Sequence, residues 1–301
     1  MKTICIFNPE HDLCLANGGA NYVPPASAMV FASKSADLMR WVYPDAQCVS
    51  VDQFVVPSEP YAIIPWGWNR VLKNQLLRLG AAESQLPSDE VLSCVRNLQH
   101  RSTALPLQSD VCECRTLDEV EVGLSRYGSI VLKSPLSGSG RGLRWINESF
   151  VENDLHWISK QLQHHHSVML EPKREVACDF ALEYCSSAEG VSFVGYSLFD
   201  TRNGVYRGNV MWSDDTIARH IEQYVGEHLH TEKSRVESFL SSIAAGYCGF
   251  LGVDLMVCRE GEGYRIHVAE INFRHTMGLI AHEVYKRGCV EEGSVWVPEV
   301  R

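Results

Sequence analysis

Short apolar runs alternate with helically spaced apolar positions in the first part of the chain. Runs of strand length, bounded by polar, glycine or proline residues, predict buried strands at 3–7, 48–56 and 61–65. Apolar positions that recur every three or four residues predict helices at 26–43 and 70–79. Strands that alternate with helices are typical of a parallel α/β sheet. We therefore expect residues 1–96 to form an N-terminal parallel α/β domain.

Paired strands replace this alternation from Ser129 onward. Apolar or alternating runs predict strands at 129–134, 143–146, 167–170, 180–185, 191–199, 250–258 and 264–272. Helical spacing predicts helices at about 153–163 and 215–245. The second part of the chain is therefore expected to be α+β, and its last two strands to form a hairpin.

The composition limits the partners and the location of the protein. The chain has 301 residues, 45% of them hydrophobic, and a formal net charge of -10, so it can bury a large core. Nucleic acids and anionic membranes attract basic surfaces, and the negative charge argues against both as main partners. No apolar stretch is long enough to predict a signal peptide or a membrane span. The eleven cysteines, an odd number without a CxxC pair, are predicted to be reduced thiols of a cytoplasmic protein.

The predicted C-terminal hairpin brings acidic side chains together. If Gly261 centres an odd-length turn, Asp254 lies opposite Val268 and diagonal to Glu270, with both acids on one face. A shift of the pairing by two residues would place the acids directly opposite each other. Asn272, two positions after Glu270, shares that face.

Two neighbouring carboxylates on a half-buried sheet repel each other unless a cation or a proton lies between them. Oxygen ligands without thiol or imidazole suit a hard ion such as Mg²⁺. The alternative is structural, with Asp254 and Glu270 each paired to an arginine such as Arg274. Both interpretations stay open on the hairpin alone.

A glycine-rich segment, residues 135–142, follows the strand that ends near Lys133. Glycines let backbone N–H groups approach phosphate oxygens, and a lysine adds a positive charge. Without a Gly-Lys-Ser/Thr triplet the segment is not a Walker loop. A later apolar strand ends in Glu171, followed by Pro172, and could bind the edge of a base.

Polar loops follow two predicted strands of the first domain. Ligands of open α/β sheets bind at the carboxyl ends of strands, which indicates Glu10, His11 and Asp12 after the first strand and residues 66–69 after a later one. The alternative is that these residues cap helices and pack.

The order of these features along the chain resembles the ATP-grasp superfamily of ligases. A lysine strand with a small-residue loop precedes a strand ending in glutamate, then an aspartate strand, then Glu-x-Asn-x-Arg; the most specific piece is 270–278. The resemblance covers about 97–285 and implies an ATP-grasp-like domain at 97–290, preceded by a pre-ATP-grasp-like α/β domain. Its small lobe would span about 128–172 and its large lobe about 173–290, with 291–301 as a C-terminal tail.

The resemblance also implies roles for residues. Lys133 would contact the α- and β-phosphates, the glycine-rich loop would cover the triphosphate, Glu171 would bind the adenine amino group and Glu175 the ribose. The implied ATP-binding set is Arg101, Lys133, Ser137, Gly138, Ser139, Gly140, Gly142, Glu171, Lys173 and Glu175. Asp254, Glu270 and Asn272 would bind one or two Mg²⁺ ions, a role that Mn²⁺ could also fill.

Catalysis would rest on Arg274 and Lys133, and substrate contacts on Arg207, Asn209 and the Glu10-His11-Asp12 loop. The implied reaction joins a small carboxylate to an amine or other nucleophile through an acyl phosphate, with release of ADP and phosphate. A small-molecule kinase and a non-catalytic ATP sensor are the alternatives, and a metal hydrolase built on the Glu10-His11-Asp12 loop ranks last. A homodimer is compatible with these features.

Overall fold

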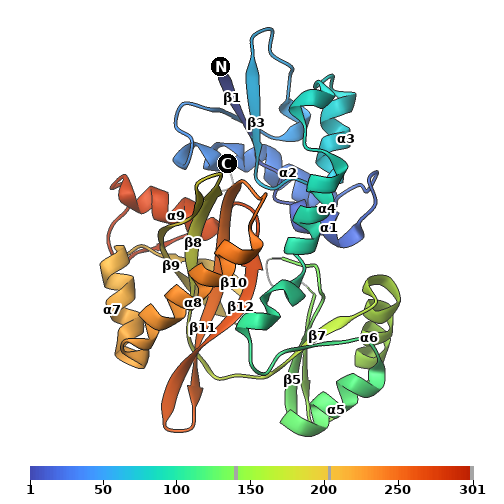
Figure 1. Cartoon of the computed structure of the whole chain (residues 1–301), viewed down its shortest axis with the longest axis vertical. Coiled ribbons are helices and arrows are strands. Elements are labelled where there is room, and N and C mark those ends of the chain that lie inside the picture. Colours follow the sequence, from blue (N-terminus) through green and yellow to red (C-terminus); the bar gives the residue numbers. More distant parts are fainter. Residues whose placement is uncertain (139–141, 203–204, 299–301) are drawn as a thin grey trace.

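The computed structural model describes residues 1–138, 142–202 and 205–298. Among them, the strands form three separate sheets, one for the N-terminal domain and one for each of two lobes (Figure 1). The expected combination of a parallel α/β domain with antiparallel lobes is confirmed.

The N-terminal sheet is parallel, in the order β2-β1-β3. Its strands are β1 (Lys2–Ile6), β2 (Gln47–Val49) and β3 (Tyr61–Pro65). Its helices are α1 (His11–Asn17), α2 (Ala26–Ser35), α3 (Arg70–Arg78) and α4 (Asp89–Leu98). The predicted strand 48–56 is too long, because Ser50 and Gln53 form a capping box that starts a 3₁₀ turn at Val51–Gln53. The predicted helix 26–43 continues beyond α2 as the 3₁₀ segment Ala36–Trp41.

The small lobe carries the sheet β4-β7-β5-β6. Its strands are β4 (Cys112–Cys114), β5 (Ser129–Lys133), β6 (Leu143–Asn147) and β7 (Val168–Pro172). Its helices are α5 (Leu117–Tyr127) and α6 (Glu152–His165), which pack on the sheet through a buried apolar core. Since β4 pairs with β7, the lobe begins near Cys112, earlier than the predicted boundary of about 128. A 3₁₀ segment, η4 (Arg101–Leu107), leads into it.

The large lobe carries the sheet β12-β11-β8-β9-β10-β13. Its strands are β8 (Val176–Ser187), β9 (Gly190–Arg202), β10 (Val205–Val210), β11 (Gly249–Glu260), β12 (Gly263–Asn272) and β13 (Val295–Trp296). Its helices are α7 (Asp214–Val225), α8 (His228–Ile243) and α9 (Met277–Lys286). The predicted helix 215–245 is two helices, because Gly226 takes φ +57° and ends α7. The predicted tail contributes β13, which pairs with β10.

Helix α9 joins the large lobe to the N-terminal domain. Ile280, Ala281 and Val284 of α9 share a buried apolar cluster with Phe7 and Trp66 of the N-terminal domain. Fully burying such large side chains stabilises by roughly 1.5–3 kcal/mol each. The loops after β1 and β3 are thereby held beside the segment that follows β12.

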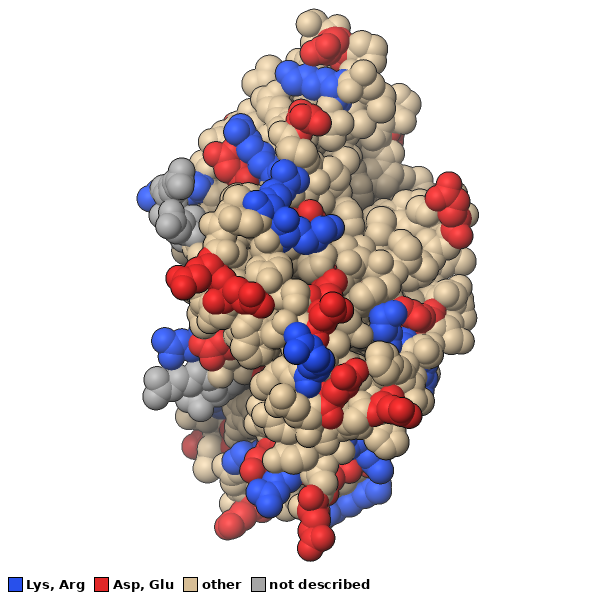
Figure 2. Space-filling model, turned by 90° about the vertical axis from the view of Figure 1, so that its left-hand side faces the viewer, with Lys and Arg blue, Asp and Glu red and all other residues tan. Residues whose placement is uncertain are grey.

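The surface and the thiols agree with the composition. Figure 2 shows acidic and basic side chains interspersed on the face that it presents. No helix in the described ranges has the length and apolar character needed to cross a membrane. All eleven cysteines are free thiols.

Candidate functional site

A cavity of about 390 Å³ is lined by residues of the N-terminal domain and of both lobes, a size typical of small-molecule sites. Its lining includes five carboxylates and three cationic side chains: Asp12, Glu171, Asp179, Asp254, Glu270, Arg101, Lys133 and Arg274. The lining therefore carries an excess of negative charge, which favours a bound cation.

The acids of the hairpin face each other directly. Gly261 and Glu262 form its turn, so that Glu260 pairs with Gly263, and the predicted odd-length turn centred on Gly261 is wrong. The register then shifts between Asp254 and Leu255, and Asp254 pairs with Glu270. This is the directly opposed arrangement considered above as the alternative, and opposed residues of an antiparallel pair share a face.

A bulge at Ala269 produces this arrangement. Leu255 pairs with Val268 and Asp254 with Glu270, which leaves Ala269 as the extra residue of β12. Without it, Asp254 would pair with Ala269, and Glu270 would lie on the opposite face, with the buried Val253. The bulge therefore places the second carboxylate in the cavity.

The electrostatics of the opposed acids favour a cation. Burial and the neighbouring charge of Glu270 raise the pKa of Asp254 well above its usual range. The amide of Asn272 donates to Asp254 Oδ2 at 3.0 Å, while Glu270 forms an ion pair with Arg101. The alternative, in which each acid pairs with an arginine, thus holds for Glu270, whose partner is Arg101.

The donor set fits Mg²⁺ of the kind that accompanies a nucleotide. Among the described residues, no group of three or more His, Cys, Asp or Glu side chains is arranged to hold a metal ion. Mg²⁺ beside phosphates needs only one or two protein carboxylates, because phosphate oxygens and water complete its six ligands. Asp254 and Glu270 meet that requirement, whereas Asn272 directs its amide nitrogen at Asp254 and its oxygen at Arg274.

Arg274 is bound to the N-terminal domain. Its Nη2 lies 3.0 Å from Asp12 Oδ2, and its Nε donates to the same carboxylate at 3.1 Å. It also donates to Asn272 Oδ1 at 3.0 Å. Burial disfavours ionisation of Asp12, but the charges of Arg274 and His11 outweigh burial and hold the pKa of Asp12 below its usual value. Arg274 thus connects the first turn of α1 with the hairpin.

Lys133 and Glu171 form an ion pair at the small-lobe wall of the cavity. Their Nζ and Oε1 atoms are 2.6 Å apart, and both side chains are about nine-tenths buried. Each comes from the end of a strand, β5 and β7, and the two strands pair antiparallel. A charge pair of this kind presents both a cation and a hydrogen-bond acceptor to a ligand.

The glycine-rich loop is anchored at its start by Arg101. The guanidinium donates to the carbonyl oxygens of Ser134 and Ser137 at 3.1 Å each. Farther along, a side chain at Gly138 would overlap the carboxylate of Asp12, so glycine permits this close approach. Ser139 and Gly140, both predicted to bind phosphate, lie outside the described residues, and Gly142 accepts from Ser134 N at 2.8 Å.

Comparison with known proteins finds likeness in three dimensions only. No protein-family model and no curated protein sequence matches the chain. D-alanyl-alanine synthetase A from Vibrio cholerae matches with a TM-score of 0.56 at 13% identity, over 96% of this chain and 93% of its own. D-cycloserine synthetase DcsG matches at 0.53 and 12%, over 95% and 99%. N5-carboxyaminoimidazole synthetase from Staphylococcus aureus, complexed with ADP, matches at 0.53 and 12%, over 91% and 71%.

These three proteins are ATP-grasp enzymes, and the matches extend over nearly the whole chain. The chain has the ATP-grasp fold. In this fold the cavity lies where the two lobes meet, and β11, β12, β5 and β7 supply Asp254, Glu270, Lys133 and Glu171 to it.

Several predicted residues lie outside the lining of the ATP-grasp cavity. Lys173 donates to Asn147 Oδ1 at 3.2 Å, and its backbone N–H donates to Ser129 O. Glu175 is 74% exposed and lies 3.9 Å from Arg259. Arg207 is exposed, whereas Asn209 is buried and its Oδ1 accepts from the hydroxyl of Tyr206 at 2.5 Å.

The three residues after β1 have different environments. Asp12 lines the cavity. Glu10 is 3% exposed, and burial raises its pKa to about 7. His11 is fully buried, burial lowers its pKa to about 4, and its Nδ1 lies 3.2 Å from Asn69 Nδ2. The structure therefore brings one of the three to the site.

Two acids of β8 were not predicted as site residues. Asp179 lines the cavity and accepts from Thr201, and burial raises its pKa. Glu183, 1% exposed, accepts from Ser197 at 3.0 Å and from Thr276 at 2.8 Å, and burial raises its pKa to about 7. Their even spacing on an apolar strand was the available signal, since it puts both on one face.

Apolar side chains complete the cavity from elements far apart in sequence. They come from the N-terminal loops, from α2, from the small lobe, from the large-lobe sheet and from the start of α9. Those lining the cavity include Pro9, Phe31, Trp66, Val131, Leu143, Trp145, Phe199, Met256 and Met277. No short sequence pattern connects these positions, and they were not predicted.

Proposed function

We propose that this protein is a Mg²⁺-ATP-dependent ligase, which joins a carboxylate to an amine or another nucleophile through an acyl phosphate and releases ADP and phosphate. The observation that carries the proposal is the direct opposition of Asp254 and Glu270 in the same cavity as Lys133, Glu171 and Arg274. A cation stabilises opposed buried carboxylates, and Lys133 and Arg274 could exchange their present carboxylate partners for phosphate oxygens. Mg²⁺ with a triphosphate supplies both.

We assign the nucleotide to the space between the lobes. Glu171 would accept from the adenine amino group while Lys133 turns from Glu171 to the phosphates. Val131, Leu143 and Met256 offer apolar surfaces to the base. We assign the ribose contact to Asp179 instead of Glu175, because Asp179 lines the cavity and Glu175 is exposed outside it.

Asp254, Glu270 and Asn272 would hold the metal. Bound there, Mg²⁺ neutralises the charge that develops on the phosphates during transfer. Arg101 contacts Glu270 and the start of the glycine-rich loop, so it would keep the loop and the metal ligands in register. Ser137 and Gly138 are the described residues that would lie over the triphosphate.

Arg274 would orient the substrate carboxylate and stabilise the phosphoryl group in transfer. One carboxylate oxygen attacks the γ-phosphorus, the bond to the bridging oxygen breaks, and ADP leaves. The nucleophile then attacks the acyl carbon and phosphate leaves. This chemistry needs positioning and charge neutralisation more than a protein nucleophile. The free thiols and the absence of a membrane-crossing helix in the described chain support our assignment of the enzyme to the cytoplasm.

The test is turnover of ATP with pooled carboxylic acids, with hydroxylamine as the trapping amine. The ligase gives a hydroxamate and ADP. Release of AMP would overturn the acyl-phosphate route, and a stable phosphorylated product that hydroxylamine does not trap would identify a kinase. Tight ATP binding without turnover would identify a sensor.

A further inference from the structure

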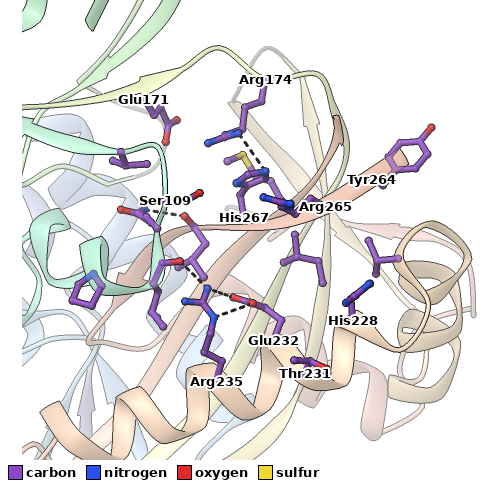
Figure 3. Close-up of a pocket in the computed structure, with 18 residues that line it drawn as sticks. Ser109, Glu171, Arg174, His228, Thr231, Glu232, Arg235, Tyr264, Arg265 and His267 are labelled. Carbon is purple, nitrogen blue, oxygen red and sulfur yellow. Dashed lines mark hydrogen bonds and ion pairs between the residues drawn. The ribbon is translucent and has the colours of Figure 1, made fainter. Parts of the chain in front are cut away.

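A second cavity, of about 730 Å³, lies at the outer edge of the large-lobe sheet (Figure 3). Its walls are the segment 106–111, the edge strand β12, the first turns of α8, and Arg174 on the connection between the lobes. Glu171 and Met256 line both this cavity and the one described above. The reaction proposed above does not use this space.

Arg174 is a nearly buried cation whose carboxylate partners are not close. Its side chain is 10% exposed, yet its guanidinium lies 3.4 Å from Glu260 and 3.5 Å from Asp110. Hydrogen bonds between charged groups are normally 2.7–2.9 Å long. A nearly buried cation needs close partners to offset its lost hydration, so an additional anion beside Arg174 would be stabilised.

The contacts of His267 also indicate that an additional anion beside Arg174 would be stabilised. The Nε2 atom of His267 lies 2.7 Å from Glu260 Oε1. The same atom lies 3.2 Å from Arg174 Nη1, and Figure 3 marks this second contact. A single ring nitrogen either donates to the carboxylate or accepts from the guanidinium, but it does not do both. An anion bound to Arg174 would draw the guanidinium away and leave His267 free to donate to Glu260.

The rest of the wall favours a ligand with an apolar body. Arg235 is already satisfied, because it contacts Glu232 at 2.6 Å and the carbonyl oxygen of Leu107 at 2.8 Å. Apolar side chains form much of the lining: Pro106, Leu107, Val111, Val225, Ile266 and Val268. A ligand that covered them would gain from removing apolar surface from water.

We propose that this cavity binds a small organic anion, with its carboxylate or phosphate on Arg174 and an apolar body against Val225, Ile266 and Val268. Arg174 follows Glu171 closely in the connection between the lobes, and Glu171 lines both cavities. Occupancy therefore alters nucleotide affinity, and by linkage the nucleotide alters anion affinity by the same factor. This coupling rests on the proposed function, whereas the binding does not.

The experiment is isothermal titration of the full chain with benzoate, hexanoate and phenyl phosphate. Arg174→Gln should weaken binding about tenfold or more, since a hydrogen bond to a charged group is lost. The control is Arg259→Gln. Arg259 is close to the hairpin turn in the sequence, is 55% exposed and does not line the cavity. It should leave binding within twofold of the wild type. Whichever of the carboxylates or the phosphate binds more tightly identifies the head group.

A second variant tests the cavity itself. Thr231 lines it from the exposed side of α8, so Thr231→Trp should block binding while the circular dichroism spectrum stays unchanged. The site is overturned if no probe binds, if Arg174→Gln and Thr231→Trp both bind normally, or if a saturating non-hydrolysable ATP analogue displaces the probe completely.

The coupling is measured as the Kd of that analogue with and without saturating probe, and a shift of at least threefold is expected. Normal probe binding with an unchanged analogue Kd overturns the coupling alone. Probe binding to a protein that binds no ATP analogue would overturn the proposed function and leave the anion site standing.

Discussion

The two ends of the cavity between the lobes hold their charges in opposite ways. At the hairpin end, Asp254 faces a second carboxylate, Glu270, and burial raises the pKa of Asp254. At the N-terminal end, Asp12 faces a cation, Arg274, which holds the pKa of Asp12 below its usual value despite burial. At the hairpin end Glu270 is paired with Arg101 and Asp254 still needs a proton or an added cation, whereas the N-terminal end is neutralised already. A substrate carboxylate that binds Arg274 must compete with Asp12.

The largest effect is expected where the carboxylates oppose each other. Glu270→Gln should lower Mg²⁺-dependent turnover by about 10³-fold or more, because a metal ligand that stabilises developing charge is lost. Thermal unfolding should change less than turnover, since the removal of one of two repelling charges partly offsets the loss of the ion pair between Glu270 and Arg101. Steady-state ATP turnover at several Mg²⁺ concentrations measures the effect. Full activity of this variant would show that the metal assignment is wrong.

The ion pair at the N-terminal end should matter for stability. Asp12→Asn leaves the buried Arg274 without its carboxylate partner, and we expect the free energy of unfolding to fall by about 3–5 kcal/mol. Denaturant titration measures it. The control is Asp37→Asn, whose aspartate forms an exposed ion pair with Arg40 at 3.0 Å and should be nearly neutral. Equal losses in the two variants would contradict the comparison.

The glycine-rich loop reaches the N-terminal end through Gly138. Gly138→Ala would place a methyl group against the carboxylate of Asp12 and displace the loop. A displacement of about 1 Å at a catalytic loop can cost about 10²-fold in kcat/KM. Gly263→Ala is the control, because a side chain there meets open space. Unchanged kinetics for both variants would show that the approach of the loop to Asp12 has no catalytic role.

The contribution of Glu10 to the free energy of unfolding can be tested by changing the pH. Burial raises its pKa from 4.5 to about 7, so the folded protein keeps this proton to a higher pH than the unfolded chain. Its contribution to stability is complete below about pH 4.5 and is lost as the pH rises towards 7. Glu10→Gln should remove a decline of up to about 3 kcal/mol over that range. Denaturant titrations at several pH values measure it, with the exposed Glu59→Gln as control. An undiminished slope in Glu10→Gln would contradict this assignment.

Short-range patterns predicted one end of the cavity better than the other. Four acidic or basic residues that lie within or directly after predicted strands line the cavity: Lys133, Glu171, Asp254 and Glu270. The partner of Arg274 is Asp12, 262 positions away, and no local pattern connects them. The apolar wall has the same origin, since Phe31 and Trp66 reach the site only because α9 packs on the N-terminal domain.

The fold, too, could be predicted where local patterns determine it and not where distant contacts or turn geometry do. The strand positions could be predicted from apolar runs. The single helix predicted over 215–245 is wrong, because Gly226 has a positive φ, which the spacing of apolar residues cannot indicate. Asp179 was missed because one acid on a long strand is a weak signal without its partner Thr201, which comes from β9. Register was the hardest feature, since it depends on a turn length and a bulge together.

The bulge at Ala269 separates the hairpin into two halves whose residues pair in different registers. On the turn side of it, Met256 and His267 are paired; on the far side, Asp254 and Glu270 are paired. Deleting Ala269 would leave a regular ladder in which Leu255 still pairs with Val268 and Asp254 with Glu270. Pairing Ala269 into the ladder opposite Asp254 would instead move Glu270 to the other face of the sheet. A one-residue slip of the pairing at this point is therefore equivalent to exchanging the carboxylate opposite Asp254 for an alanine, although no side chain would have been replaced.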